Sequence, residues 1–469
     1  MDQMVTGLGD GAAARTLGPP GPSLAERLKT GRAMRQSARR SSHGAWEPAP
    51  DRPDPVEILV ESNRDRVPEL VPLRYARMLA SPFSFLRGSA LVMALDLATT
   101  ASAGPAVQLC GDAHLSNFGI FASPERRLLF DLNDFDETWP GPFEWDLKRL
   151  ATSAAVLGRT RGLSSTAARR LAVAAARSYR RWAHSYADMT HLEVWYARLD
   201  ARQLLDLMAP SDRIGVQRTL TKATRRTHHR ALAKLTRLEA SGHRRIVPDP
   251  PLVTRLRPSD AGLLEQLPAM IEQYRHSLQP DRLALFDHYR LVDVARKVVG
   301  VGSVGTLCWV LLLEGPNGGP LFLQAKQAGR SALRLAGLAG PDLHDGERVV
   351  RGQQRLQAAS DILLGWTTAP SSGNSYYLRQ LWDAKGSAEV ESMSPAALTT
   401  YVEACGWALA RAHARTGASS AIAGYLGRSD RFDEAIGDFA NAYTDQTERD
   451  HAALRAAAAG GIIPVSERI

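Results

Sequence analysis

Residues 110–117 read CGDAHLSN and residues 128–136 read LLFDLNDFD, and these two stretches decide the fold. A short β-prone run at 107–110 leads into the first stretch, which is a polar loop. Alternating bulky residues on either side of Ser-Pro-Glu predict a hairpin over 118–132. Loop and hairpin together carry a dense set of polar side chains: Asp112, His114, Asn117, Asp131, Asp134 and Asp136.

This density of carboxylates predicts a metal or phosphate site. Neighbouring carboxylates repel one another, and aspartates flanked by Phe130, Leu132 and Phe135 are costly to bury without a cation. The alternative is that the aspartates only cap the turns at the ends of the hairpin. We favour the metal or phosphate site because turn capping does not need so many acidic side chains.

Composition limits the class of protein. Of the 469 residues 44% are hydrophobic, which suffices for a large core, and no apolar run reaches the roughly 20 residues of a membrane helix. We therefore expect a cytoplasmic protein without membrane contact.

Three widely spaced cysteines predict neither disulfides nor zinc. A net charge of +9 suits a nucleotide or another anion, but no nucleic-acid-binding motif is present, so nucleic acid is not an expected partner. Nothing predicts the oligomeric state.

The order of patterns along the chain predicts an α+β fold in two lobes. Residues 144–245 have an almost entirely helical pattern, and 81–85 resemble a short extended piece. We expect four segments, which are a disordered basic arm at 1–50, a helical lobe with the catalytic and metal-binding loops at 51–289, a small β lobe with a glycine loop at 290–385, and a helical segment completing the large lobe at 386–469.

A glycine-rich segment follows the predicted strand at 292–299. A lone G-x-G-x-x-G pattern is weak evidence for a dinucleotide site, and here a β-prone run at 306–313 follows instead of a helix. The segment is therefore interpreted as a glycine hairpin, whose backbone N–H groups can approach phosphate oxygens closely. Its candidate phosphate-binding residues are Gly300, Gly302, Ser303 and Gly305.

Two charged residues follow the glycine hairpin. Lys326 ends the predicted strand at 321–326, and Glu347 begins a helix about 20 residues later. Each alone would fit an ordinary small sheet. Together with the glycine hairpin they follow the order by which protein kinases hold the α and β phosphates of ATP. We therefore predict that both residues belong to a nucleotide site.

The loop at 110–117 resembles the catalytic loop of aminoglycoside-phosphotransferase-type kinases, and the segment at 134–147 resembles their metal-binding aspartate segment. The wider stretch from about 54 to 455 resembles the bacterial family called domain of unknown function 2252. Its family motifs are PLRY at 72–75, SPFSFLRG at 81–88 and RVVRGQ at 348–353. The resemblance implies a protein-kinase-like fold that binds ATP and Mg²⁺.

The resemblance also implies roles for the loop residues. Asp112 would orient or deprotonate an acceptor hydroxyl, and His114 would fix the loop by hydrogen bonds. Asn117 and Asp134 would hold magnesium, with Asp136 as a further metal ligand. On the nucleotide side, Lys326 would contact the α and β phosphates and Glu347 would position it, while Asp146 would brace the loop from the start of a helix.

Two features depart from the kinase pattern. Cys110 stands where these kinases usually have histidine. The glycine segment also follows the catalytic loop, whereas in ordinary kinases it precedes it. The helical pattern at 401–415 resembles the helix that normally leads into the loop, so we predict a circular permutation. This requires Lys326 to lie within about 10 Å of Asp134, since both must reach one triphosphate.

The favoured function is therefore an ATP- and magnesium-dependent phosphotransferase with an unidentified acceptor, with transfer of AMP as a variant. The alternatives are a metal-dependent phosphoesterase, because GDAH also resembles a two-metal motif, and a nucleotide-binding pseudokinase or regulatory module. Arg87 and Arg379 are further candidates for contact with nucleotide or acceptor, against the commoner role of arginines that cap or bridge elements.

Overall fold

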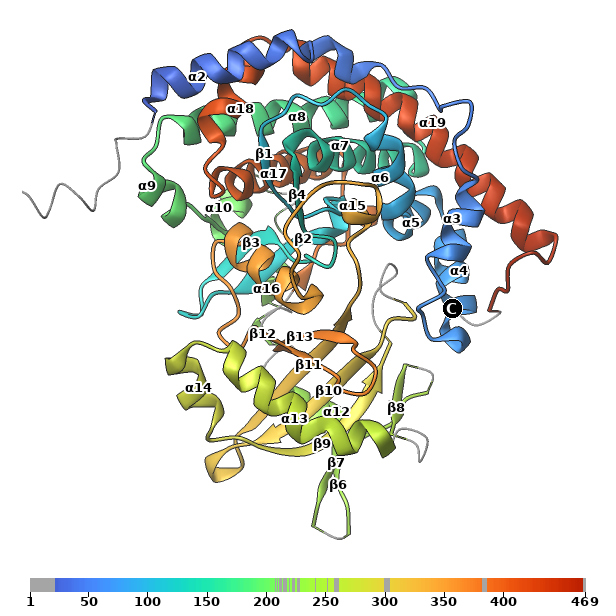
Figure 1. Ribbon diagram of the computed structural model, residues 1–469, viewed down its shortest axis with the longest axis vertical. Coiled ribbons are helices and arrows are strands. Elements are labelled where there is room, and N and C mark those ends of the chain that lie inside the picture. Colours follow the sequence, from blue (N-terminus) through green and yellow to red (C-terminus); the bar gives the residue numbers. More distant parts are fainter. Residues whose placement is uncertain are drawn as a thin grey trace, which may run out of the picture.

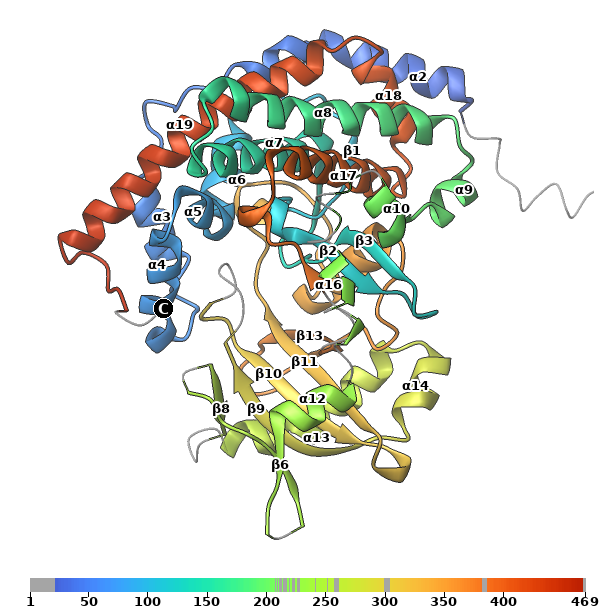
Figure 2. The same cartoon turned by 180° about the vertical axis from the view of Figure 1, so that it is seen from behind.

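The computed structural model describes residues 22–466, apart from 207, 209, 211–212, 214–216, 219, 222–223, 226–227, 241, 251, 257–260, 299–303 and 382–385. Helices gather in one layer, and an antiparallel sheet lies against it with helices of its own (Figures 1 and 2). The α+β class is thereby confirmed. Within the described residues, no helix is long and apolar enough to cross a membrane.

Two long helices form the centre of the helical layer. In α7, Phe143–Thr160, every residue from Phe143 to Gly158 is buried, and the turn at Gly162 (φ 83°) leads into α8, Ser165–Ala187. Three helices from the end of the chain pack on this pair: α17, Pro395–Ala414, α18, Ser419–Leu426, and α19, Arg431–Ala459. Smaller helices complete the layer: α3 (Pro55–Glu61), α4 (Val71–Leu79), α5 (Pro82–Gly88), α6 (Ala90–Ala98), α9 (His191–Tyr196) and α10 (Ala201–Asp206).

Short strands carry the polar loop within the helical layer. Strand β1, Ala106–Leu109, pairs with β4, Trp139–Pro142, and the predicted hairpin is formed by β2, Phe118–Ala122, and β3, Leu128–Leu132. The edge strands of this small sheet are β14 (Gly386–Ser387) and β5 (Leu199–Asp200). In the stretch at 144–245, for which an almost entirely helical pattern was expected, helices predominate among the described residues. They are interrupted by β5, by β6 (Thr236–Leu238) and by β7 (Arg244–Ile246).

The larger sheet has six antiparallel strands in the order β12-β13-β11-β10-β9-β8. Their bounds are Val253–Arg255 (β8), Arg290–Lys297 (β9), Cys308–Glu314 (β10), Pro320–Ala328 (β11), Gly365–Thr368 (β12) and Ser375–Gln380 (β13). The predicted turn between β10 and β11 is present, with Asn317 at φ 59° and Gly318 at φ 72°. Side chains alternate between the two faces along β10, as they must in a strand: Trp309, Leu311 and Leu313 enter one apolar cluster, and Val310 and Leu312 another.

Helices that precede the sheet in sequence cover both of its faces. Helix α13, Ala261–Ser277, and α14, Pro280–Phe286, supply Tyr274 and Phe286 to one apolar cluster, and α12, His228–Leu235, supplies Ala231 to the other. The helices between residues 228 and 286 therefore pack on the sheet, although they lie in the range 51–289 for which a helical lobe was expected. The helical pattern indicates which face of a helix is buried but not which neighbour covers it.

The basic N-terminal segment is folded, although a disordered arm was expected over 1–50. Residues 1–21 lie outside the described part, and α2, Leu24–Ala33, begins with a capping box between Ser23 and Glu26. Helix α2 lies against α18 at very short range (Figure 1): an added Cβ at Gly31 would stand 1.9 Å from the carbonyl oxygen of Ala421. The two glycines that face each other's helices, Gly31 and Gly424, permit this approach.

Arginines of this segment cap a helix. Arg35 donates to the carbonyl oxygens of Tyr425 (2.8 Å) and Gly424 (2.6 Å), and Arg40 donates to that of Leu426 (2.6 Å). These carbonyls end α18, where the helix dipole favours cations. The sequence of this segment resembles a disordered arm because its binding partners are distant along the chain. Arg35 and Tyr425 are 390 residues apart, and Arg40 and Leu426 are 386 residues apart.

The segment at 81–85 is a helix rather than the expected extended piece. Ser81 is the N-cap of α5 and accepts a hydrogen bond from the backbone N–H of Ser84, 3.0 Å away. Pro82 occupies the first turn, where the missing N–H costs nothing. The proline that suggested a break in helical structure therefore marks the start of a helix.

We predict that Gly31→Ala loosens α2, because the new methyl group would collide with a backbone carbonyl that cannot move alone. Limited trypsin digestion should cleave after Arg27, Lys29 and Arg32 faster than in the wild type. Gly262→Ala, where an added Cβ meets nothing within 4 Å, is the control. Equal cleavage in all three proteins would contradict the docked helix.

We also predict that acid destabilises the protein through His43. Burial, with a smaller effect from Lys148, lowers the pKa of His43 to about 3, and its ring lies 2.6 Å from the hydroxyl of Tyr425. A lowered folded-state pKa means that the stabilisation is present above pH 6.5 and is lost as the pH falls. Between pH 6.5 and 5 the loss is about 2 kcal/mol in the free energy of unfolding.

The measurement is urea unfolding at both pH values. His43→Gln, which stays neutral, should show a fall smaller by about this amount, and the exposed His276→Gln should retain the wild-type fall. If His43→Gln and the wild type lose the same stability, His43 is not the group that titrates.

Candidate functional site

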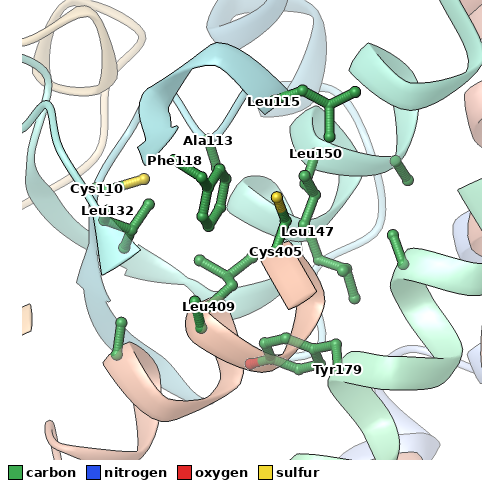
Figure 3. Close-up of a cluster of buried hydrophobic side chains, with 14 of the residues drawn as sticks. Cys110, Ala113, Leu115, Phe118, Leu132, Leu147, Leu150, Tyr179, Cys405 and Leu409 are labelled. Carbon is green, nitrogen blue, oxygen red and sulfur yellow. The ribbon is translucent and has the colours of Figure 1, made fainter. Parts of the chain in front are cut away.

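Apolar side chains fasten the loop at 110–117 to the core of the helical layer. Figure 3 shows Cys110, Ala113 and Leu115 directed into a cluster that includes Leu147 of α7 and Leu409 of α17. All five side chains are almost fully buried. The loop therefore rests on a packed surface, which limits how far its polar side chains can move.

Asp146 holds the start of the loop by hydrogen bonds. Its carboxylate accepts from the backbone N–H groups of Cys110 (2.8 Å) and Gly111 (3.0 Å), and a ring nitrogen of His413 lies 3.2 Å away. Gly111 has φ 85°, and an added Cβ there would stand 2.2 Å from the carbonyl oxygen of Glu137. The brace implied by the family resemblance is thus present, and a glycine is required beside it.

A second contact from the same helix face was missed by sequence analysis. Arg149 lies one turn after Asp146, and its Nε donates to Oδ1 of Asp112 at 2.5 Å and its Nη2 to the carbonyl oxygen of Leu86 at 2.8 Å. Ser153, a further turn on, accepts from the backbone N–H of Leu115 at 3.1 Å. Arg149 and Ser153 follow Asp146 by three and seven residues, so the three side chains lie on one helix face. This spacing could have revealed Arg149.

Asp112 is a partly buried carboxylate, with its side chain 18% exposed. Burial raises the pKa of Asp112 above its usual range, although Arg149 opposes this shift. His114 Nε2 lies 3.5 Å from Oδ2 of Asp112, while its Nδ1 is buried without a partner among the described residues. Burial, Arg87 and Arg149 hold the pKa of His114 well below its usual range, so the imidazole is neutral.

Backbone contacts join the loop to the metal-binding segment. The amide nitrogen of the Asn117 side chain donates to the carbonyl oxygen of Asp112 (2.7 Å). The carbonyl oxygen of Asn117 in turn accepts from the backbone N–H of Asn133 (2.8 Å), next to Asp134. These contacts keep Asn117 between the loop and the predicted metal-binding aspartates.

Lys326 on β11 reaches these aspartates from the sheet. Its Nζ donates to Oδ2 of Asp136 at 2.7 Å and lies 3.8 Å from Oδ1 of Asp134, and the hydroxyl of Tyr377 donates to Oδ1 of Asp136 at 2.6 Å. The lysine is 3% exposed, whereas Asp134 and Asp136 are 33% and 28% exposed. Lys326 therefore lies within the roughly 10 Å of Asp134 that a shared triphosphate site requires. Lys326 and Asp136 are 190 residues apart in the sequence.

The charges of this cluster act strongly on one another. Burial opposes ionisation of Asp136, yet Lys326 and Tyr377 lower its pKa to about 2. Asp134 behaves in the opposite way, because burial and the neighbouring charge of Asp136 raise its pKa. Despite burial, the two aspartates hold the pKa of Lys326 well above its usual range. Lys326 is therefore charged at any physiological pH.

Glu347 does not hold Lys326, contrary to expectation. Its carboxylate pairs with Arg351 at 2.5 Å, and Asp136 takes the place expected for it. The residue after it, Arg348, joins α16, Asp345–Leu356, to the metal-binding segment by donating to the carbonyl oxygens of Asp136 and Thr138, both at 2.9 Å.

The glycine hairpin is described only at its end. Gly300, Gly302 and Ser303 lie outside the described residues. Gly305 has φ 91°, and its carbonyl oxygen accepts from the backbone N–H of Val67 at 2.7 Å. Arg66 donates to the carbonyl oxygen of Val304 at 2.6 Å. The end of the hairpin is thereby tied to the helical layer.

Comparison with known protein families identifies the family of this chain. A family model described as "Uncharacterized protein conserved in bacteria (DUF2252)" matches residues 66–457. The chain belongs to this family. The matched residues include both Asp112 and Lys326, so the DUF2252 domain contains both halves of the site. The search of curated proteins and the search of solved structures found no match.

The donor set of this DUF2252 protein suits a magnesium ion bound together with phosphate. Among the described residues, no three His, Cys, Asp or Glu side chains group as a metal centre of their own. The charges of Asp136 and Asp112 oppose ionisation of Asp134, and those of Lys326 and Arg379 favour it. Asn117 and Asp134 offer oxygen atoms of the kind that magnesium prefers.

Asp131 leaves the candidate set. Its side chain is 1% exposed, and both carboxylate oxygens lie 2.8 Å from Nη2 of Arg411. The backbone N–H of Ala358 also donates to it, at 2.8 Å. In this DUF2252 chain Asp131 therefore joins β3 to α17 as a structural ion pair.

We predict strong coupling between Arg149 and Asp112. A double-mutant cycle with Arg149→Met and Asp112→Asn should give a coupling energy of about 2–4 kcal/mol in urea unfolding, because either single change leaves one charge buried without its partner. The exposed pair Arg64–Glu61 (74% and 58% exposed) is the matched control and should give less than about 1 kcal/mol. Additive effects of the two site substitutions would contradict the contact.

Proposed function

We propose that this chain transfers the γ-phosphoryl group of ATP, with magnesium, to a hydroxyl group of an unidentified acceptor. One observation carries the proposal: Lys326 lies 2.7 Å from Asp136 and 3.8 Å from Asp134, beside the loop with Asp112 and Asn117. A buried, charged lysine next to partly exposed aspartates is the charge arrangement that a metal–triphosphate needs.

Asp112 is the proposed base. The acceptor hydroxyl would give its proton to the Asp112 carboxylate, its oxygen would bond to the γ-phosphorus, and the bond to the β–γ bridging oxygen would break to release ADP. The raised pKa of Asp112 makes it a better base than an ordinary carboxylate. Arg149 binds Oδ1 and so fixes the orientation of Oδ2.

Lys326 would contact the α and β phosphates, as in the kinase pattern. Asp136 and Tyr377 would hold the ammonium group in the role that we had expected for Glu347. Magnesium, when bound, would neutralise phosphate charge, and Asn117 and Asp134 are its proposed ligands.

We further propose a circularly permuted kinase-like arrangement. The hydroxyl of Tyr401 on α17 donates to the carbonyl oxygens of Leu115 and Phe118, each at 3.0 Å, and His413 near the end of α17 reaches Asp146. The helix that would precede the loop in an ordinary kinase thus packs on it from 286 residues away. This contact supports a cut between α17 and the loop.

A nucleotide-binding regulatory module is the second candidate, because Arg149 already engages Asp112. A turnover assay separates it from the enzyme: phosphoryl transfer releases ADP, AMP transfer releases pyrophosphate, and a regulatory module releases neither. The phosphoesterase alternative is disfavoured, since it would leave Lys326 and its contacts with Asp136 and Asp134 without a role.

We predict micromolar, magnesium-dependent binding of ATP by calorimetry. Asp134→Ala and Lys326→Ala should each weaken it by about tenfold or more, because each removes a charge-assisted contact to the metal–triphosphate. Asp51→Ala and Lys29→Ala change exposed residues and should bind as the wild type does. A folded wild type that binds no ATP with magnesium present would overturn the proposed function.

A further inference from the structure

Arg87 lies in the last turn of helix α5 and is not explained by the packing of that helix. Phe83, Phe85 and Leu86 are each 1% exposed and enter the apolar core, and Gly88 is buried against a neighbouring side chain. The guanidinium of Arg87 lies over the ring of Phe83, with its carbon 6.0 Å from the ring centroid. The segment thus uses its apolar residues to hold an arginine at the edge of the loop at 110–117.

One polar atom of Arg87 lacks a partner. Its Nε is buried and makes no hydrogen bond within the described part of the chain. Arg149, which is buried, differs: it donates to a carboxylate and to a carbonyl oxygen. A guanidinium carries five donors, and leaving desolvated donors unpaired is costly.

The charges around Arg87 also favour an anionic partner. Arg149 donates both to Asp112 and to the carbonyl oxygen of Leu86 (2.8 Å), the residue before Arg87, so this end of α5 borders the proposed base. The charge of Arg87 acts on Asp112 and on His114. Arg149 already neutralises Asp112, and the imidazole is neutral, so Arg87 leaves an excess positive charge at this side of the loop. The only other acidic group acting on it among the described residues is the exposed Glu391.

We propose that Arg87 binds an oxyanion of the acceptor, so that the acceptor is a hydroxyl compound that also carries a phosphate or a carboxylate. This inference rests on the proposed function, because the acceptor hydroxyl is placed at Asp112. The planar guanidinium binds either oxyanion through two parallel hydrogen bonds. Arg87 is partly buried against Phe83, which reduces its contact with water and strengthens those bonds.

The test is calorimetric titration of the full chain with three probes that share a hydroxyl-bearing skeleton: glycerol 3-phosphate, glycerate and glycerol. The wild type should bind one anionic probe at least about tenfold more tightly than glycerol, and Arg87→Gln should lose that difference. The exposed Arg64→Gln is the matched control and should retain it. Preference for the phosphate or the carboxylate identifies which oxyanion is recognised.

Two outcomes overturn the inference: equal binding of all three probes by the wild type, or unchanged preference in folded Arg87→Gln. Should that variant not fold, Arg87→Lys decides, because an ammonium group cannot form the paired bonds and about tenfold must be lost. Binding of ATP is measured on the same preparation. Arg87-dependent anion binding without ATP binding would uphold this site and reject the kinase function, and the reverse would reject this site alone.

Discussion

The contact of Lys326 with Asp136 and Asp134 is the constraint on which the arrangement depends. It is the point at which the sheet meets the hairpin of the helical layer, and its lysine is almost fully buried. Breaking such a contact on one side leaves an uncompensated charge in a site of low dielectric. Arg348 reinforces the junction by donating to the backbone at Asp136 and Thr138, so the two parts are held in one orientation by charge and by backbone hydrogen bonds.

The loop at 110–117 and Lys326 are held in place by different parts of the structure. Asp146, Arg149 and Ser153 hold the loop from a single helix face, and this helix is buried over nearly its whole length. Lys326, in contrast, stands at the end of a strand that also carries the apolar face of a smaller core. The loop and Lys326 therefore rest on different apolar cores, which meet at the contact of Lys326 with Asp136 and Asp134.

Sequence patterns predicted the local elements well. The hairpin at 118–132, strands β9 to β11, the turn around Asn317 and helix α17 all follow from periodicity and turn residues. The resemblance to kinases also predicted that Lys326 lies near Asp134, since both would have to reach one triphosphate. What failed was long-range pairing. In the sequence Arg35 belongs to a segment expected to be disordered, because the end of α18 that it binds is distant along the chain. Glu347 was expected to hold Lys326, but Glu347 pairs with Arg351, and Lys326 pairs with Asp136.

The 190-residue separation of the lysine from its aspartates has a consequence for biosynthesis. As the chain leaves the ribosome, Asp134 and Asp136 emerge long before Lys326, and at usual elongation rates the delay is roughly 10–40 s. During that interval the hairpin lacks its counter-charge, and α7 and α8 lack α17 and α19 to cover them. The hairpin and this helix pair can therefore reach their final packing only after the second half of the chain has been synthesised.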